Sequence, residues 1–200
     1  MFASELSGNP GYLELMATRR RDLVAQCTPI FADGRPSILE IGSGHGHFLT
    51  AYAESYPERL CVGIDVVGER IERALRKRDR AGLANLHFVR AELRFFLECV
   101  SPEARWQEVY VLFPDPWPKV RHHKHRLIQD DVIQLIAQQA APACRLYFRT
   151  DFLPYYEAAT AVFERSADWE LLTEPWPFES VTVFQSRAAT HYSLVAKRRA

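Results

Sequence analysis

Short apolar runs alternate along the chain with longer segments in which apolar residues recur at helical spacing. The apolar runs predict buried strands at residues 36–42, 60–66, 86–91, 108–113 and 145–150. The other segments predict helices at residues 46–56, 68–80, 92–99, 126–140 and 153–165. Such alternation is typical of βαβ units, whose right-handed crossovers place helices on both faces of a parallel sheet.

The pattern changes after Trp169, where the apolar runs at residues 169–172, 180–186 and 191–198 follow one another without a helix long enough for a crossover. Strands connected in this way pair antiparallel. The sequence therefore predicts an α/β fold with a single doubly wound, mostly parallel sheet and an antiparallel C-terminal edge. This order is typical of class I methyltransferases, and the count of elements also fits a dehydrogenase-like Rossmann fold.

The length of 200 residues and the 48% hydrophobic content predict one domain over residues 1–200, with the first ten or so residues disordered. Lys plus Arg and Asp plus Glu each number 25, so any RNA binding must come from local clusters of charge. The four cysteines are far apart and show no spacing for zinc or redox chemistry. Because no apolar segment reaches the roughly 18 residues of a membrane span, we expect a cytoplasmic protein without membrane attachment. The oligomeric state stays open between a monomer and a homodimer.

A glycine-rich loop directly follows the first predicted strand and precedes a predicted helix, with glycines at Gly42, Gly44 and Gly46. Glycines at such a turn allow a ligand to approach the backbone closely, although they are also common in ordinary tight turns. A dinucleotide-binding loop favours a third glycine where this chain has His47. The loop therefore predicts a ligand site without favouring a pyrophosphate.

Three carboxylates stand where parallel strands end or approach their end. Asp65 ends the second strand and can accept hydrogen bonds from ribose hydroxyls, or it can cap the next helix. Glu40 lies inside an apolar strand and needs a partner there, either a cationic ligand or a nearby arginine. Glu92 follows the third strand and can bond the adenine amine or lie in the first turn of a helix.

A proline-rich loop follows the fourth strand and leads into a basic run. Prolines at 114, 116 and 118 restrict the backbone and hold Asp115 at the end of the strand. Trp117 can stack on a base or pack in the core, and the core is the more common place for a single Trp. The basic run suits phosphates, and its histidines lack the carboxylate or cysteine partners of a metal site. Its cations are Lys119, Arg121, Lys124 and Arg126, with His122, His123 and His125 among them.

These motifs resemble the family of tRNA (guanine-N7) methyltransferases over about residues 38–197. The likeness rests on EIGSGHG, the GID strand end, FPDPWPKVRHHKHR and the TD pair at residues 150–151, all in the family's order. It implies S-adenosylmethionine as cofactor and tRNA as partner. It further implies that Lys119 and Asp151 contact the substrate, and that Asp115 is catalytic and also contacts the cofactor together with Glu40, Asp65 and Glu92.

The chain departs from the family near its C-terminus. The family's TxFE stretch, which contacts the substrate, matches Thr182 to Gln185, so the family's glutamate is a glutamine here. An amide can still form hydrogen bonds to the guanine edge. In the family's commonest pattern the first of two further acids is the longer one and the second is the shorter one. Here the order is reversed, because Asp65 is the shorter acid and Glu92 is the longer one. Asp151 has an alternative role as the cap of the helix predicted from Leu153.

Guanine N7 carries a lone pair and no proton, so methyl transfer to it requires orientation and desolvation rather than a general base. The purine becomes cationic during transfer, and a carboxylate such as Asp115 stabilises that charge. Alternatives are a methyltransferase for a small molecule or protein, an RNA-binding homologue that has lost catalysis, and a nicotinamide-dependent oxidoreductase. His47 and Glu40 disfavour the last of these.

Overall fold

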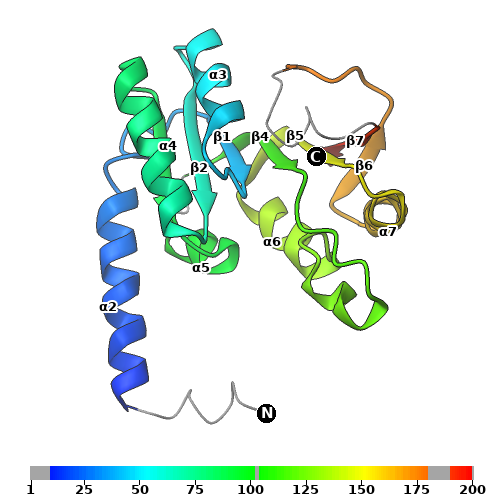
Figure 1. Cartoon of the computed structure of the whole chain (residues 1–200), viewed down its shortest axis with the longest axis horizontal. Helices are drawn as coiled ribbons and strands as arrows, with labels where there is room; N and C mark the ends of the chain where they lie inside the picture. The colour runs from blue at the N-terminus through cyan, green and yellow to red at the C-terminus, as the bar shows by residue number, and fades with distance from the viewer. Residues whose placement is uncertain (1–9, 102–103, 180–189, 200) are drawn as a thin grey trace.

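The structure, a computed structural model, describes residues 10–101, 104–179 and 190–199. Its centre is a seven-stranded sheet in the order β3-β2-β1-β4-β5-β7-β6 (Figure 1). The strands are β1 (Ser37–Ile41), β2 (Leu60–Asp65), β3 (Leu86–Arg90), β4 (Trp106–Leu112), β5 (Ala140–Thr150), β6 (Trp169–Leu172) and β7 (Tyr192–Arg198). The helices are α2 (Pro10–Cys27), α3 (His47–Ser55), α4 (Gly68–Ala81), α5 (Leu93–Cys99), the 3-10 helix η1 (Val120–His125), α6 (Asp130–Gln139) and α7 (Leu153–Glu164).

The pairing of the strands confirms the predicted α/β fold class. Strands β1 to β5 pair in parallel, with Ile38 opposite Cys61 on β2 and Glu108 on β4. Strand β7 then pairs antiparallel with both β5 and β6. The run at 180–186 lies outside the described residues, as do residues 1–9. The antiparallel edge therefore rests on the other two C-terminal runs.

Both faces of the sheet are covered, because successive side chains of a strand point to opposite sides. On one face, Ile38 and Tyr110 pack with Phe48 of α3 and Ile71 of α4. The other face is covered by α2, α5, α6 and α7, whose apolar side chains pack against alternate strand residues such as Leu39 (Figure 1). In the part of the chain that the structure describes, no helix combines the length and the hydropathy needed to cross a bilayer.

Three helical elements differ from the sequence-based prediction, which lacked the 3-10 helix η1 as well as the features described next. Helix α2 was not predicted, because only Leu23 and Cys27 of its 18 residues are buried and its apolar period is therefore weak. The helix predicted at residues 126–140 begins only at Asp130, since Gln129 before it has an extended backbone. Arg126 instead ends the 3-10 helix η1, with its N–H donating to the carbonyl of His123 at 3.0 Å.

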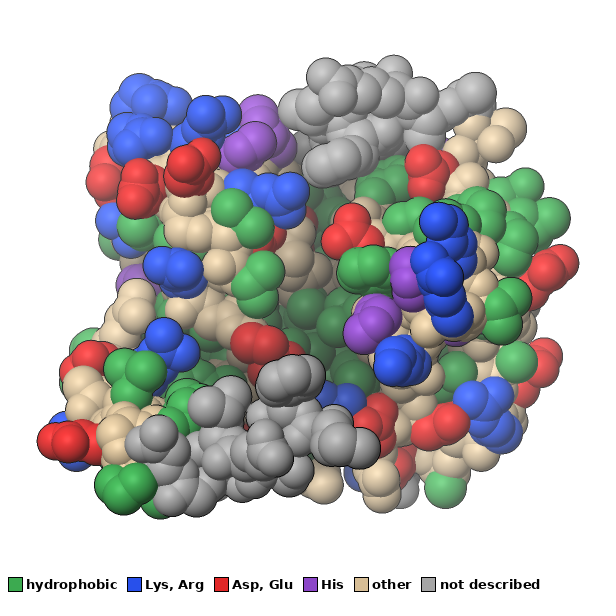
Figure 2. Space-filling model, turned by 60° about the horizontal axis from the view of Figure 1, so that its bottom comes forward, with side chains coloured by type: hydrophobic (Ala, Val, Ile, Leu, Met, Phe, Trp, Pro, Cys, Tyr) green, Lys and Arg blue, Asp and Glu red, His purple; other side chains and the backbone are tan. Residues whose placement is uncertain are grey.

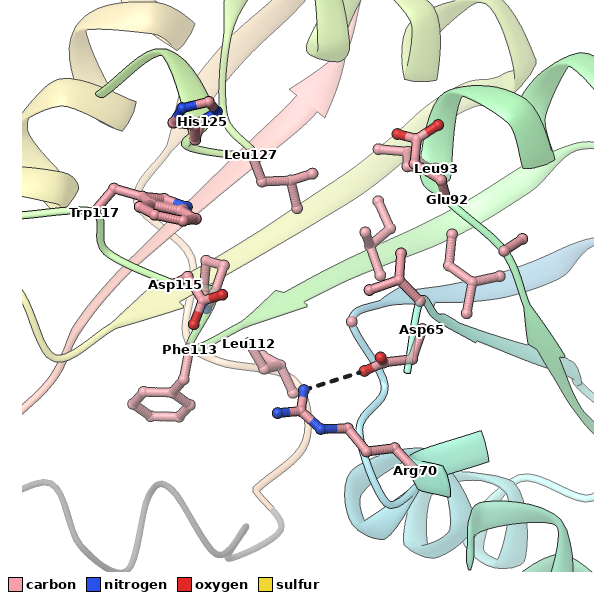
Figure 3. Close-up of a pocket in the computed structure, with 16 residues that line it drawn as sticks. Asp65, Arg70, Glu92, Leu93, Leu112, Phe113, Asp115, Trp117, His125 and Leu127 are labelled. Atoms are coloured by element: carbon pink, nitrogen blue, oxygen red, sulfur yellow. Dashed lines mark ion pairs between the residues drawn. The ribbon is translucent and has the colours of Figure 1, made fainter. Parts of the chain in front are cut away.

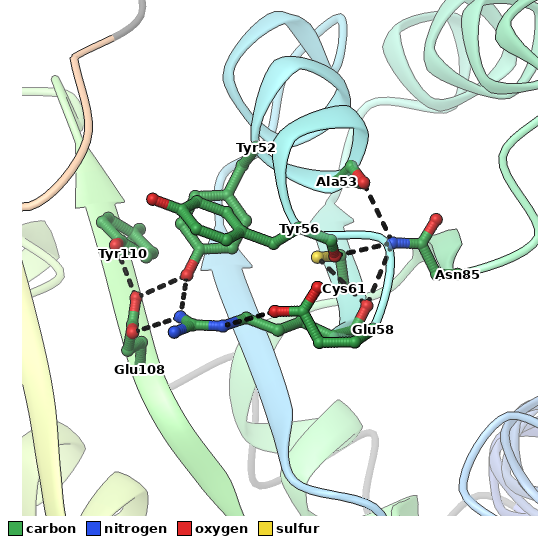
Figure 4. A network of polar contacts seen from close by, with 9 residues as sticks. Tyr52, Ala53, Tyr56, Glu58, Cys61, Asn85, Glu108 and Tyr110 are labelled. Carbon is green, nitrogen blue, oxygen red and sulfur yellow. Dashed lines mark hydrogen bonds and ion pairs between the residues drawn. The ribbon is translucent and has the colours of Figure 1, made fainter.

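A polar network lies near the amino-terminal ends of β2 and β4, away from the carboxyl ends of the strands (Figure 4). Glu108 accepts hydrogen bonds from the hydroxyls of Tyr52 at 2.9 Å and Tyr110 at 2.6 Å. The guanidinium of Arg59 also donates to Glu108 at 2.6 Å and to the Tyr52 hydroxyl. Burial and the neighbouring Glu108 carboxylate raise the pKa of both tyrosines, so they stay protonated donors. The network joins α3, β2 and β4 through a single carboxylate.

We expect Glu108→Ala to lower the free energy of unfolding by about 2 to 3 kcal/mol, because it removes the acceptor of three donors. Urea denaturation measures this change. The matched control is Glu98→Ala, which removes an exposed ion pair with Arg20 and should change stability by about 1 kcal/mol or less. Equal losses in the two variants would show that the network contributes no more than a surface pair.

Candidate active site

A cavity of about 440 Å³ opens at the carboxyl ends of the parallel strands (Figure 3). Ligand sites of open α/β sheets form at this edge, because the loops after successive strands meet there. The wall of the cavity includes the glycine loop after β1, the ends of β2 and β3, and the proline-rich loop after β4. Side chains and backbone that line it include Gly42, Asp65, Arg70, Glu92, Asp115 and Trp117.

The three glycines of the loop have different surroundings. Gly42 and Gly44 have φ values of 76° and 53°, and no atom lies within 4 Å of the position that a Cβ would take. Gly46, with φ of 68°, is buried, and a Cβ there would lie 2.5 Å from Cζ of Phe88. The first two glycines therefore leave room for a ligand, whereas Gly46 is required for packing of the loop on the sheet.

Asp65 is buried at the end of β2 and holds the loops on either side of it. Its Oδ2 accepts a hydrogen bond from the N–H of Gly44 at 3.0 Å, and its Oδ1 accepts one from the N–H of Val67 at 2.8 Å. Arg70 of α4 forms an ion pair with it at 3.7 Å. The N-cap of α4 is Val67. The alternative prediction from the sequence, that Asp65 caps this helix, is therefore wrong.

Glu40 is 4% exposed and lies on β1 just before the glycine loop. Its Oε2 has no hydrogen-bond partner among the described residues. No arginine among those residues forms an ion pair with Glu40, which the sequence had offered as the alternative to a cationic ligand. Burial raises the pKa of this carboxyl, against the opposing effects of the Leu49 N–H and the charge of Lys77. A buried acceptor without a partner costs free energy unless a ligand supplies the donor.

Glu92 is the N-cap of α5, where its side chain accepts a hydrogen bond from the N–H of Phe95 at 3.1 Å. The structural role considered from the sequence was a place in the first turn of the helix, and the structure puts Glu92 one position before that turn. The residue also lines the cavity, close to the end of β3, and its side chain is exposed. Capping therefore leaves Glu92 accessible from the cavity.

Asp115 and Trp117 project from the proline-rich loop on the side of the cavity opposite Asp65 (Figure 3). The expectation that Trp117 packs in the core is wrong, since its side chain is 36% exposed. Its ring contacts His125 at a centroid distance of 5.1 Å and His122 at 5.7 Å. The indole thus lines the cavity together with His125, and the rings of η1 pack against it.

The proline-rich loop is held by an arginine that the sequence grouped with the phosphate-binding cations. Arg126 is 5% exposed, and its Nε donates to the carbonyl of Pro116 at 2.9 Å. Its guanidinium also lies 4.9 Å from the ring centroid of Tyr155. Burial lowers the pKa of Arg126, so its environment is unlike that of a solvated cation. Arg126 is therefore an anchor of the loop, and its predicted place in the basic surface is wrong.

The remaining cations of the run stay on the surface. Lys119, Arg121 and Lys124 are exposed on and just before η1, next to the mouth of the cavity. Asp151 is exposed after the end of β5, and the N-cap of α7 is Phe152 rather than Asp151. Thr182 and Gln185 lie outside the described residues. Within the described ranges, no three His, Cys, Asp or Glu side chains are grouped to hold a metal ion.

The sequence did not single out Arg70, which lines the cavity and pairs with Asp65. Its position in the first turn of the helix after the acidic strand end is the signal that could have indicated it. A cation near a helix N-terminus opposes the helix dipole, so it is usually placed there by another contact.

The fold is shared with solved methyltransferases. The 16S rRNA (adenine(1408)-N(1))-methyltransferase from Catenulisporales acidiphilia superposes with a TM-score of 0.60 at 21% identity, covering 88% of this chain and 92% of that one. A protein described as a putative methyltransferase from Thermoplasma acidophilum gives a TM-score of 0.56 at 16% identity, over 83% of this chain and 70% of that one. At these identities the likeness shows the fold alone.

The sequence itself matches a family described as "Putative methyltransferase" over residues 34–198. A protein of Syntrophotalea carbinolica named tRNA (guanine-N(7)-)-methyltransferase is 34% identical over 73% of this chain, which spans 63% of that relative's length. A protein of the same name from Chromohalobacter salexigens is 31% identical over 79% of this chain and 68% of its own length. The chain therefore belongs to the family of the tRNA (guanine-N7) methyltransferases.

Proposed function

We propose that the protein transfers a methyl group from S-adenosylmethionine to N7 of a guanine in tRNA, in the cytoplasm. The observation that carries the proposal is the composition of one cavity. One wall, called the inner wall here, has the open glycine loop and the acidic strand ends with Asp65 and Glu92. The opposite wall has the exposed carboxylate of Asp115 and the exposed indole of Trp117. The names of the relatives support the same substrate.

The residues of the inner wall fit the cofactor. S-adenosylmethionine supplies, when bound, an electrophilic methyl group on a positively charged sulfur. Glu40 offers a buried acceptor without a partner to the cationic part of such a ligand, and the missing side chains at Gly42 and Gly44 leave it space. Asp65 and Glu92 keep acceptor capacity toward the cavity for ribose hydroxyls and an adenine amine.

The residues of the opposite wall suit a guanine. Because N7 has a lone pair and no proton, the site needs no general base. The role of Asp115 is instead to stabilise charge. Positive charge develops on the purine during transfer, so the Asp115 carboxylate stabilises the transition state more than the ground state. Lys119 and Asp151, which are exposed, are assigned to substrate contacts together with Thr182 and Gln185.

Trp117 is well placed to stack on the target base. Its φ of 43° is costly for a residue with a side chain, by about 1 to 3 kcal/mol, so the surrounding contacts must hold it there. The contacts are the flanking prolines, the Arg126 bond to Pro116 and the rings of η1. An indole held in this position binds any planar purine, and it binds a cationic one more strongly.

The direct test incubates the protein with unmodified tRNA and S-adenosylmethionine labelled in the methyl group. Nucleoside analysis of the tRNA should then show labelled 7-methylguanosine. Label in another nucleoside would move the reaction to another atom, and label only in a small molecule or protein would support the first alternative substrate class. Cofactor binding without any labelled product would indicate a homologue that binds RNA without catalysis.

We expect Glu40→Gln to stabilise the fold while weakening cofactor binding. The pKa of Glu40 is raised in the folded state, so the folded protein holds a proton that the unfolded chain releases above the ordinary glutamate pKa. The stability of the wild-type protein therefore falls as pH rises from the ordinary glutamate pKa toward the raised pKa of Glu40 in the folded state. The variant avoids this loss. At pH 7 its free energy of unfolding should exceed that of the wild type by about 1 to 3 kcal/mol, and at pH 4 it should show no such gain.

Urea denaturation at the two pH values and calorimetric titration with S-adenosylmethionine measure these effects. The matched control is Glu54→Gln, an exposed glutamate on α3, which should change neither quantity. If Glu40→Gln kept full cofactor affinity, the unpartnered oxygen would have no part in the site.

We expect Asp115→Asn to lower the methylation rate by roughly 10² to 10³-fold while the affinities for cofactor and tRNA change little. The amide keeps the size of the side chain, and the proline-rich loop stays anchored by Arg126. Single-turnover kinetics with saturating tRNA measure the step itself. A nearly normal single-turnover rate would reduce Asp115 to a binding residue and leave the family assignment standing.

A further inference from the structure

Helix α4 carries an unusual density of positive charge that the proposed function has not used. Its 14 residues, GERIERALRKRDRA, include six cations and three carboxylates. This is about a quarter of all Lys and Arg in a chain whose charges balance overall. Figure 2 shows Lys and Arg side chains gathered at one side of a central hollow, with another basic group beside histidines at the opposite side.

One side of α4 faces the cavity and the glycine loop. Arg70 lines the cavity, and Nζ of Lys77 donates to the carbonyl of His45 in the loop at 3.0 Å. Burial, followed by the charges of Arg73, Arg70 and Lys77, lowers the pKa of His45. These cations therefore form a cluster beside the glycine loop, on the wall opposite the proline-rich loop and η1.

Three arginines of α4 have no carboxylate partner in the part of the chain that the structure describes. Arg73, Arg76 and Arg80 are exposed, and none has an ion pair among the described residues. The other two arginines of the helix pair with Asp65 and Asp79. On the opposite face, exposed Arg20, Arg94 and Arg165 form ion pairs at 2.6 to 2.8 Å. Arg19 and Arg21 of α2 are exposed there without an ion pair among the described residues, so α4 differs by carrying three such arginines on one helix of 14 residues.

The stability of the helix does not explain this arrangement. Cations near a helix C-terminus are favourable, which accounts for Arg80, but Arg73 lies too early in the helix to benefit. Arg73 with Lys77, and Arg76 with Arg80, are like charges four residues apart, a spacing that destabilises a helix by a few tenths of a kcal/mol. Glu69 and Glu72 have the spacing to pair with Arg73 and Arg76 but form no ion pair with them in this structure. A bound polyanion relieves the repulsion.

We propose that Arg73, Arg76 and Arg80 of α4 form a second surface that contacts RNA phosphates, across the cavity from η1. The proposal rests on the proposed function and specifies how the substrate is held. The three arginines span about 10 Å of helix axis, a length suited to two or three neighbouring phosphates. The basic surfaces on α4 and η1 then hold the RNA backbone on both sides of the base that enters the cavity.

The test variant is Arg73→Gln/Arg76→Gln/Arg80→Gln. It leaves Lys77 and Arg70 in place, because those cations contact the glycine loop and Asp65. The first control is Arg20→Gln/Arg94→Gln/Arg165→Gln, which removes the same charge from helices over the opposite face. The second control, Glu69→Gln/Glu72→Gln, removes acids from α4 itself. A Lys119→Gln/Arg121→Gln/Lys124→Gln variant provides the comparison at η1.

We expect the α4 variant to bind unmodified tRNA about tenfold or more weakly at low salt. The slope of log affinity against log salt should flatten by up to about 0.9 per lost phosphate contact, as for the η1 variant. The KM for tRNA should rise, while kcat at saturating tRNA, cofactor affinity and thermal unfolding stay near wild type. The acid-to-amide control should bind tRNA as tightly as wild type or more tightly.

The proposal is overturned if the α4 variant has the same affinity and salt slope as the opposite-face control. A fall in kcat with unchanged KM would also overturn it, because it would place the arginines in the catalytic machinery. Failure of the proposed function gives a different result, since the wild-type protein itself would then leave tRNA unmethylated.

Discussion

The position of the glycine loop depends on one close contact, the packing of the Phe88 ring against two positions that lack a Cβ. A Cβ would lie 2.5 Å from the ring at Gly46 and 2.7 Å from it at Gly63. Because both are glycines, the loop after β1 can lie against the sheet. Gly44 of the loop then donates its N–H to the carboxylate of Asp65. Glu40, on the strand just before the loop, is buried. The inner wall of the cavity thus follows from a packing constraint on residues that do not line it.

Charge is separated between the interior and the rim of the site. The buried acidic side chains of Glu40 and Asp65, of which Glu40 has a raised pKa, lie beside the glycine loop, whereas exposed cations stand on η1 and α4 at either side of the cavity. The balanced net charge of the chain conceals this separation. Acidic groups inside suit a cationic ligand, and basic groups outside suit a polyanion, so one opening can serve both in the proposed reaction.

Arg126 shows how a residue of the basic run can act through structure rather than through charge at the surface. Its guanidinium is buried against Tyr155 and bonded to Pro116, and it therefore fixes the loop that carries Asp115 and Trp117. Preorganised groups stabilise developing charge without the cost of reorganising during the reaction. The proline-rich loop and its arginine anchor supply that rigidity here.

The sequence by itself determined the order and type of the strands that the structure describes, the antiparallel edge formed by the last of them, and the meeting of acidic residues at one edge of the sheet. Those inferences succeed because they depend on local periodicity and on the rule that parallel strands bring their carboxyl ends to one edge. Asp65, Glu92 and Asp115 accordingly line one cavity. Only the tertiary structure decided that Trp117 is exposed, that Arg126 is buried and that α4 turns Lys77 toward the glycine loop. These outcomes depend on which side chains from distant segments meet, and no local pattern in the sequence records that.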